Sequence, residues 1–207
     1  MTVATLTPEA KTRSRGRPRE FDMDAALDAA LRVFSERGYH AASISELTEA
    51  MGLASGSIYK AFKDKRGIFL AAFAHYRKLG RRRLEAMIAS AKTGREKVFQ
   101  MVMYYTELSY GEAGRKGCLV VGGANDFALL DEEAAAHVVT AFAADEKLMA
   151  DLIRIGQADG TITKTVDPDA AALAFLCFTK GLRVIGKTGR SREEMLSAAE
   201  AAMKLVT

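Results

Sequence analysis

The residue types best suited to bind nucleic acid lie in one short segment, Ser55 to Lys60, which reads SGSIYK. Small residues let a backbone approach a partner, hydroxyls reach phosphates or base edges, and a lysine adds positive charge. On a helix, Ile58 and Phe62 would face inward. The outward face would consist of Ser55, Gly56, Ser57, Tyr59 and Lys60. Such a helix can enter the major groove of DNA, although a surface helix of an ordinary bundle has the same pattern.

Two helices precede this segment and would hold it in place. In the first, apolar residues recur at intervals of three and four and form one buried stripe, which stops at Gly38. The second begins at Ser43 with Glu46 three residues later, the pattern of a capping box. Gly52 can end it in a left-handed conformation, and a third helix begins near Ser55. This order predicts a helix-turn-helix.

A basic segment lies ahead of these helices. From Lys11 to Arg19 the chain has five Lys or Arg residues and no acid, with Arg15 and Arg17 on either side of a glycine. Without apolar periodicity, it is predicted to be a flexible arm that suits the narrow minor groove of A·T-rich DNA. A solvated tail is the alternative. On the other side of the predicted reading helix, Lys60 to Arg83 has nine basic residues and one acid.

Residues 20 to 70 resemble the DNA-binding domain of TetR-family transcriptional regulators. The first part of the family pattern is met by Phe34, Gly38, Tyr39, Ser43, Ile44 and Leu47. The part of the pattern that covers the turn and the reading helix is met by Gly52, Leu53, Gly56, Ser57, Ile58, Tyr59, Phe62 and Lys65. Ala54 departs from the pattern, because a helix-capping serine is usual there, so Ser55 is expected to take the cap. The Gly-Arg-Pro-Arg arm and the Gly-Cys-Leu segment around Cys118 resemble one branch of the family.

The resemblance implies an all-α fold, with a three-helix DNA-binding domain followed by a helical ligand-binding and dimerisation domain. The expected boundaries are 1–19 for the arm, 20–66 for the helix-turn-helix and 67–207 for the effector and dimerisation domain. The partner would be double-stranded DNA with a palindromic operator. Its expected contacts are Arg15, Arg17, Ser43, Ser45, Ser55, Gly56, Ser57, Tyr59, Lys60 and Lys65.

Two helices at the carboxyl end are predicted to form a homodimer interface. They begin at Asp167 and at Ser191, where a second capping box stands. The stretch Ala170 to Ile185 is apolar on nearly all sides, and the last helix has a stripe of Met195, Leu196, Ala199, Ala202, Met203 and Val206. Pairing of two such pairs into a four-helix interface, as the resemblance implies, would cover these residues. Burial within one monomer is the alternative.

Cys118 is the candidate sensing residue. It lies in a glycine-rich segment, Arg115 to Phe127, that is expected to break helical periodicity. Arg115 and Lys116 beside it could stabilise a thiolate, and some relatives respond to oxidants or electrophiles. The alternative is a small buried hydrophobic residue. Cys177 is expected to be a packing residue, and two cysteines so far apart predict no disulfide framework.

The predicted effector pocket rests on residue types alone. In addition to Cys118, the candidates are Met101, Tyr104, Tyr105, Phe142, Phe178 and Lys180. Aromatic and methionine stripes at helical spacing usually fill a core, so only some of them are expected to line a cavity. The helix expected to run through Val138, Val139 and Phe142 has one apolar face. Lys180 is a charge in an apolar stretch, and it could pair with an acidic effector or extend to the surface.

An enzyme is the less favoured class. Gly181 to Thr188 has the spacing of a nucleotide phosphate-binding loop, but such a loop needs a strand before it, and its flanks here are helical in pattern. The three histidines have no metal-ligand spacing, so neither metal nor cofactor is expected.

Composition agrees with a helical DNA-binding protein. The 207 residues are 49% hydrophobic, and the net charge of +4 is uneven, because residues 119–151 have seven acids and one Lys. No apolar run reaches the ~18 residues of a membrane span and no signal peptide precedes the arm, so a cytoplasmic protein without a membrane partner is expected. The resemblance implies a homodimeric repressor of neighbouring genes, released from its operator by a small molecule or an electrophile. An architectural DNA-binding protein without an effector is the alternative.

Overall fold

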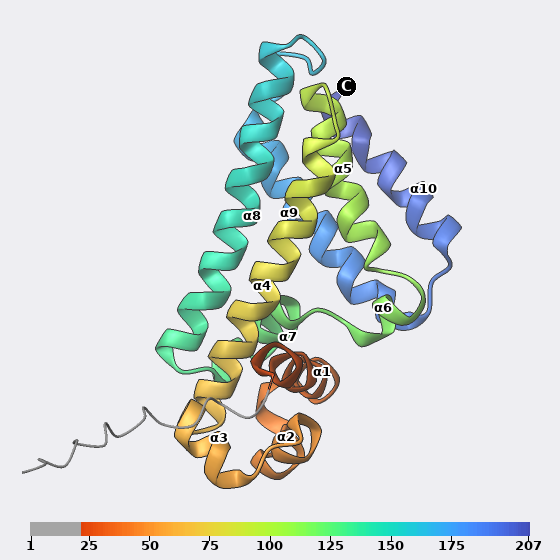
Figure 1. Cartoon of the computed structure of the whole chain (residues 1–207). Helices are drawn as coiled ribbons and strands as arrows, with labels where there is room; N and C mark the ends of the chain where they lie inside the picture. Colours follow the sequence, from red (N-terminus) through yellow and green to blue (C-terminus); the bar gives the residue numbers. More distant parts are fainter. Residues whose placement is uncertain (1–21) are drawn as a thin grey trace, which may run out of the picture.

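The computed structural model describes residues 22–207, and within this range every regular element is a helix (Figure 1). The all-α prediction is therefore confirmed. The α-helices are α1 (Met23–Ala41), α2 (Ile44–Met51), α3 (Ser55–Phe62), α4 (Lys65–Ala89), α5 (Gly94–Glu107), α6 (Gly111–Lys116), α7 (Leu119–Asn125), α8 (Glu132–Ala158), α9 (Pro168–Ile185) and α10 (Arg192–Ala202). Short 3₁₀ turns are η1 (Phe127–Leu129), η2 (Gly186–Thr188) and η3 (Met203–Val206).

The first three helices form the predicted helix-turn-helix. Gly38 interrupts α1 with φ 80° and ψ 167°, a conformation that glycine adopts without strain. At the start of α2, the Ser43 hydroxyl accepts from the Glu46 N–H and the Glu46 carboxylate accepts from the Ser43 N–H, which confirms the capping box. Gly52 ends α2 in the left-handed region, with φ 63°.

The start of α3 differs from the sequence expectation. Ala54 is the N-cap residue, with extended backbone angles of φ −64° and ψ 142°, and no side chain caps the helix. Ser55 is already the first helical residue, so the prediction that it takes the cap is wrong. The helix is fixed instead by its buried side chains, Ile58 at 0% and Phe62 at 8% exposed.

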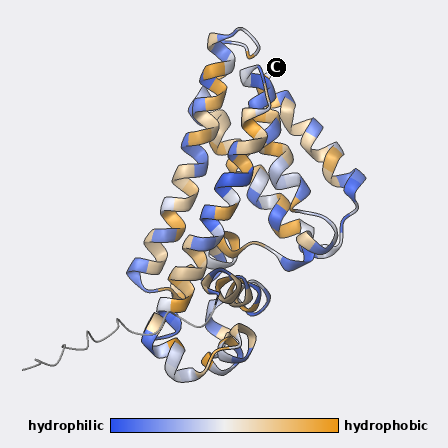
Figure 2. Ribbon diagram, viewed as in Figure 1, coloured by the Kyte–Doolittle hydropathy of each residue, from blue (hydrophilic) through white to orange (hydrophobic). Residues whose placement is uncertain are grey.

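Helix α4 runs from the helix-turn-helix into the second domain, where it packs against α5 (Figure 1). Helices α5, α8 and α9 form the centre of that domain. Figure 2 shows hydrophobic and hydrophilic residues interspersed along the long helices, and the buried apolar residues form two hydrophobic clusters.

The glycine-rich segment contains a helix that the sequence did not predict. Gly117, with φ 78°, separates α6 from α7, whereas Gly122 and Gly123 lie inside α7. Leu119 and Val120 of α7 are buried in the same hydrophobic core as the helix-turn-helix. The segment breaks helical periodicity at Gly117, as expected, but a helix resumes after this break, because α7 buries its apolar residues against α1.

The carboxyl-terminal pair also departs from the prediction. Most of the predicted α10 stripe is buried within the monomer: Met195, Ala199, Ala202, Met203 and Val206 are at most 9% exposed. Helix α9 instead exposes Leu173 at 50% and Val184 at 48%, and Cys177 between them is exposed rather than packed. Val139 of α8 is 53% exposed, so it lies outside the apolar face expected for its helix.

A glycine pair sets how closely α5 and α8 cross. A Cβ added at Gly94 would overlap the backbone of Gly156, whereas a Cβ at Gly122 in α7 would meet nothing within 4 Å. We expect Gly94→Ala to lower the free energy of unfolding by about 1 to 3 kcal/mol through overpacking. Gly122→Ala should be neutral or stabilise by about 0.5 to 1 kcal/mol, because it reduces the freedom of the unfolded chain. Urea unfolding followed by circular dichroism measures both, and equal effects would contradict the close crossing.

Candidate nucleic-acid interface and effector cavity

The outward face of α3 has the residues that the sequence predicted. Ser55, Gly56, Ser57, Tyr59 and Lys60 are all exposed, and Tyr59 keeps 53% of its surface accessible. Because no side chain caps α3, its first backbone N–H groups have no side-chain acceptor. An uncapped helix N-terminus carries partial positive charge and suits a phosphate group.

The other predicted DNA contacts have different surroundings. The Ser43 hydroxyl is bonded to Glu46, and Ser45 is exposed on α2. The Lys65 ammonium donates to the carbonyls of His40 and Ala42, each at 3.1 Å, and so joins the end of α1 to the start of α4. Its position against the helix-turn-helix backbone gives Lys65 a structural role of its own. Arg15 and Arg17 lie outside the described residues.

Cys118 lies on the α7 side of a buried polar contact with α4. The Tyr76 hydroxyl donates to its Sγ atom at 3.3 Å. Burial alone would raise the pKa of the Cys118 thiol, but the positive charge of Arg183 and the Tyr76 hydrogen bond outweigh it and hold the pKa below its ordinary value. The expectation that Arg115 and Lys116 supply this charge is wrong, since both are exposed and Lys116 pairs with Glu112 at 2.7 Å.

Asp145 forms a buried ionic cluster at the centre of the second domain. Its carboxylate accepts from Arg77 of α4 at 2.8 Å, from Lys180 of α9 at 2.7 Å and from the Tyr105 hydroxyl of α5 at 2.7 Å. Burial opposes ionisation, but the two cations hold the pKa of Asp145 below its ordinary value. Burial and the neighbouring Asp145 raise the pKa of Tyr105 well above its ordinary value. Lys180 forms its ion pair with Asp145. The expectations that it extends to the surface or pairs with an acidic effector are therefore wrong.

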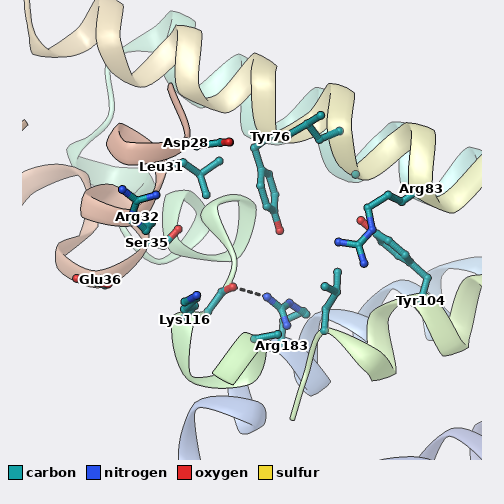
Figure 3. A pocket seen from close by; sticks show the side chains of 15 residues that line it. Asp28, Leu31, Arg32, Ser35, Glu36, Tyr76, Arg83, Tyr104, Lys116 and Arg183 are labelled. Atoms are coloured by element: carbon teal, nitrogen blue, oxygen red, sulfur yellow. Dashed lines mark hydrogen bonds between the residues drawn. The ribbon is translucent and has the colours of Figure 1, made fainter. Parts of the chain in front are cut away.

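Two cavities share Tyr76, Gly80 and Tyr104 in their walls. The larger, of about 290 Å³, opens between α1 of the helix-turn-helix and the helices of the second domain (Figure 3). Its lining residues include Asp28, Leu31, Arg32, Glu36, Tyr76, Leu79, Arg83, Tyr104, Leu108, Lys116 and Arg183. The smaller cavity, of about 30 Å³, is lined by Tyr76, Arg77, Tyr104, Tyr105, Cys118, Asp145 and Lys180, among others. It has room for roughly one water molecule and none for an organic ligand.

The cavities separate the predicted effector residues into groups. Tyr104 lines both cavities, while Tyr105, Cys118 and Lys180 line only the smaller one. The rest, Met101, Phe142 and Phe178, line neither. Met101 is 2% exposed in the core of the second domain, and the two phenylalanines are partly buried against the cores. Their helical spacing indicated packing, as aromatic and methionine stripes usually do.

Arg183 is a cavity residue that the sequence reasoning missed. It is only 2% exposed, and its Nη2 group donates to the carbonyl of Gly117. Its Nε and Nη1 groups are buried and have no acceptor among the described residues. The available signal was a second charge in the apolar stretch, one helical turn beyond Lys180.

The segment with nucleotide-loop spacing has no loop conformation. Gly181 to Ile185 continue α9, and the remaining residues form η2. Gly186 is buried directly against the backbone of Ser109, which leaves no cradle for a phosphate there. No helix in residues 22–207 is long and apolar enough to cross a membrane.

Comparison with known proteins identifies the family. Residues 26–72 match the model of bacterial regulatory proteins of the tetR family, and residues 94–202 match the tetracyclin repressor-like C-terminal domain. The chain is 26% identical over 206 residues to the transcriptional repressor ComR of Escherichia coli, covering 98% of this chain and 97% of that protein. Its fold resembles the TetR-family regulator CifR, solved as a cysteine mutant with 26-base-pair operator DNA, with a TM-score of 0.81 and 31% identity. That likeness covers 93% of this chain and 100% of the other.

The fold and the exposed reading helix define a DNA-binding transcriptional regulator of the repressor type. The chain belongs to the TetR family.

The Asp145 cluster predicts a specific pH dependence. Asp145→Asn leaves two cations without a buried counter-charge and should lower the free energy of unfolding by about 3 to 5 kcal/mol. Because the native pKa of Asp145 is depressed, its contribution is present above the unfolded pKa of about 3.9 and is lost as the pH falls below it. The difference between wild type and variant should therefore shrink below about pH 4.

Urea unfolding between pH 3 and 7, on the order of one titration per pH unit, measures this difference. Asp151→Asn is the matched control, because Asp151 makes an exposed ion pair with Lys147 on the same helix, α8. Its effect should stay within about 0.5 kcal/mol. A gap between wild type and Asp145→Asn that is constant with pH would contradict an ionised Asp145.

Proposed function

We propose that the chain is a homodimeric repressor of neighbouring genes that binds a palindromic operator and is released by a signal received in its second domain. The observation that carries this proposal is the polar, exposed and uncapped α3, in a chain whose structural relative CifR was solved on operator DNA. Two such helices would lie in successive major grooves, roughly 34 to 36 Å apart.

The proposed DNA contacts have distinct roles. The free N–H groups at Ser55 and Gly56 bind a phosphate, while Ser57, Tyr59 and Lys60 reach base edges or phosphates from the exposed face. Ser43 and Ser45 at the start of α2 and Lys65 at the start of α4 contact the flanking backbone. Arg15 and Arg17 of the arm enter the adjacent minor groove.

The proposed dimer interface is centred on α9. Leu173, Cys177, Gly181 and Val184 follow one another at spacings of three and four, so they share one face of the helix. A face with two large apolar residues about half exposed favours contact with a second copy. Because the predicted stripe of α10 is buried in the monomer, α10 contributes its outer side, where Leu205 beyond its end is 44% exposed.

The proposed signal is a small molecule in the 290 Å³ cavity, which has a volume close to the lower end for ligand sites. Modification of Cys118 by an electrophile is a second candidate, favoured by the lowered pKa of its thiol. Since Cys118 lines only the cavity of about 30 Å³, an electrophile reaches it only when α4 and α7 separate. An architectural protein, by contrast, would keep its DNA whatever the ligand.

DNA binding is tested at α3. Tyr59→Ala and Lys60→Ala should each weaken operator binding by about 1 to 3 kcal/mol without unfolding the protein, because both side chains are exposed. Fluorescence anisotropy with labelled DNA from upstream of the gene measures the affinity. Lys147→Ala, which removes an exposed lysine from α8, is the control and should bind like wild type. Unchanged affinity in folded α3 variants would remove these residues from the interface.

Dimerisation is tested at α9. Leu173→Arg combined with Val184→Glu should produce a monomer, because burying these charges in an apolar interface is unfavourable. Light scattering after size-exclusion chromatography measures the mass. Val139→Arg is the control, since Val139 is equally exposed but lies on α8 outside the proposed face. A dimer that persists in the α9 variant would place the interface elsewhere.

A further inference from the structure

We infer that the 290 Å³ cavity between the two domains binds a small organic carboxylate, with Arg183 as its counter-charge. This inference rests on the proposed function and specifies the chemistry of the ligand. Three independent features support it: an uncompensated buried guanidinium, the distribution of charge and apolar surface around the cavity, and the position of the cavity between the domains.

The first feature is the charge of Arg183. Its side chain is 2% exposed and its one acceptor among residues 22–207 is the neutral carbonyl of Gly117. A buried guanidinium is ordinarily paired with an acid and fully hydrogen-bonded, because removing its charge from water is costly. The nearby buried acid, Asp145, is already bonded to Arg77 and Lys180. Arg183 therefore lacks a counter-ion that an anionic ligand in the cavity would supply.

The second feature is the arrangement of the cavity wall (Figure 3). Arg83, Lys116 and Arg183 come from the second domain, whereas α1 contributes two acids, Asp28 and Glu36, and one cation, Arg32. This polarity directs a carboxylate toward the second domain, and Tyr104 presents a hydroxyl on the same side (Figure 3). The carboxylates of Asp28 and Glu36 oppose an anion at the α1 end.

The apolar part of the wall distinguishes an organic acid from an inorganic anion. Leu31, Leu79 and Leu108 line the same cavity. An inorganic anion would leave these side chains facing empty or poorly hydrated space, whereas the hydrocarbon part of a carboxylic acid covers them. The volume of about 290 Å³ suits a short acid rather than a long acyl chain.

The third feature is position. Helix α1 of the helix-turn-helix supplies one wall, and α4, α5, α6 and α9 supply the other. A ligand held between them has an affinity that depends on how α1 is oriented against the second domain. If the ligand binds one orientation of α1 more tightly than another, it shifts the helix-turn-helix toward the orientation that it binds more tightly.

The competing counter-ion is the Cys118 thiolate. Arg183 contributes to the lowered pKa of this thiol, and Tyr76 donates to its sulfur. The thiol itself lines only the smaller cavity, so it does not occupy the larger one. If the thiolate already neutralised Arg183, the larger cavity would have no preference for an anion.

The experiment compares hexanoate with hexanamide, which have similar shape and differ in charge, and uses phosphate as an inorganic anion. Binding to the full-length protein is measured by isothermal titration calorimetry and by thermal shift. Hexanoate should bind about tenfold or more tightly than hexanamide, the factor expected for a charge-assisted hydrogen bond. Phosphate should produce no comparable shift.

Variants test the role of each cation. Arg183→Met should abolish the preference for hexanoate, whereas Arg183→Lys should retain part of it. Arg83→Met should weaken hexanoate binding, and Arg82→Met is the control, because Arg82 is an exposed neighbour that does not line the cavity. If Arg183→Met fails to fold, as judged by circular dichroism, the Arg83 and Arg82 pair decides the question. Equal binding of acid and amide, or full hexanoate binding by Arg183→Met, would overturn the inference.

Operator binding, followed in parallel by anisotropy, separates this inference from the proposed function. Selective hexanoate binding supports the carboxylate site even if hexanoate does not release the operator. That outcome would contradict the proposal that a ligand in this cavity releases the protein from DNA. Operator release by hexanoate that Arg183→Met loses supports both. If the wild-type protein binds no operator in the absence of ligand, the proposed function is contradicted. The comparison of hexanoate with hexanamide then still tests the carboxylate site.

Discussion

The buried carboxylate of Asp145 is the interaction on which the second domain depends. It joins α8 to Arg77 of α4, Tyr105 of α5 and Lys180 of α9 within 2.8 Å, so four helices share one polar contact. A buried network of this kind fixes geometry, because each member loses its partners if a helix shifts. Helix α4 also carries the helix-turn-helix, so the position of the DNA-binding domain depends on the same contact. The remaining buried cation, Arg183, has no such partner among the described residues.

The two domains are joined by more than α4. Helix α7 lies in the hydrophobic core of the helix-turn-helix, and the Tyr39 N–H donates to the Asp126 carboxylate at 3.1 Å just after α7. Arg66 at the start of α4 bonds to Asp131 at 2.7 Å and to Glu133, both beside the start of α8. A displacement of α7 or of the amino end of α8 is therefore transmitted directly to α1 and α4. Coupling requires only two alternative arrangements of these contacts, which a ligand binds with different affinity.

The sequence predicted best where structure is local. The Ser43–Glu46 capping box and the left-handed Gly52 involve residues close in sequence, and both are present as expected. Side chains paired across the fold were not predictable in this way: Lys180 meets Asp145, 35 residues earlier, on another helix. Likewise, the positive charge that lowers the pKa of Cys118 belongs to Arg183 rather than to a sequence neighbour. The packing of α9 against α8 and α7 brings these groups together, and periodicity within a single helix contains no information about it.

The same limit explains the carboxyl-terminal pair. An apolar stripe shows that a helix face is buried, but it does not tell which surface covers it. In α10 the stripe is covered by α5 of the same chain, since Met203 and Val206 lie in the core with Val98 and Val102. In α9 the apolar residues surround the helix, so one side packs inward and Leu173 and Val184 remain exposed.

Two features bear on the proposed function: the uncapped start of α3 and the guanidinium groups of Arg183 that are unpaired within the described residues. At α3, Ala54 provides no cap, which lowers helix stability by about 1 kcal/mol relative to a serine or aspartate. Burial of Ile58 and Phe62 offsets this loss, and without a side-chain cap the first N–H groups of α3 remain available to a phosphate. At the cavity, the fold tolerates the unpaired guanidinium of Arg183 in a similar way. Since α1 packs against α2 and also forms one wall of the cavity, an anion held by Arg183 on the opposite wall would, in the proposed function, change the support of α1 and with it the orientation of the helix-turn-helix.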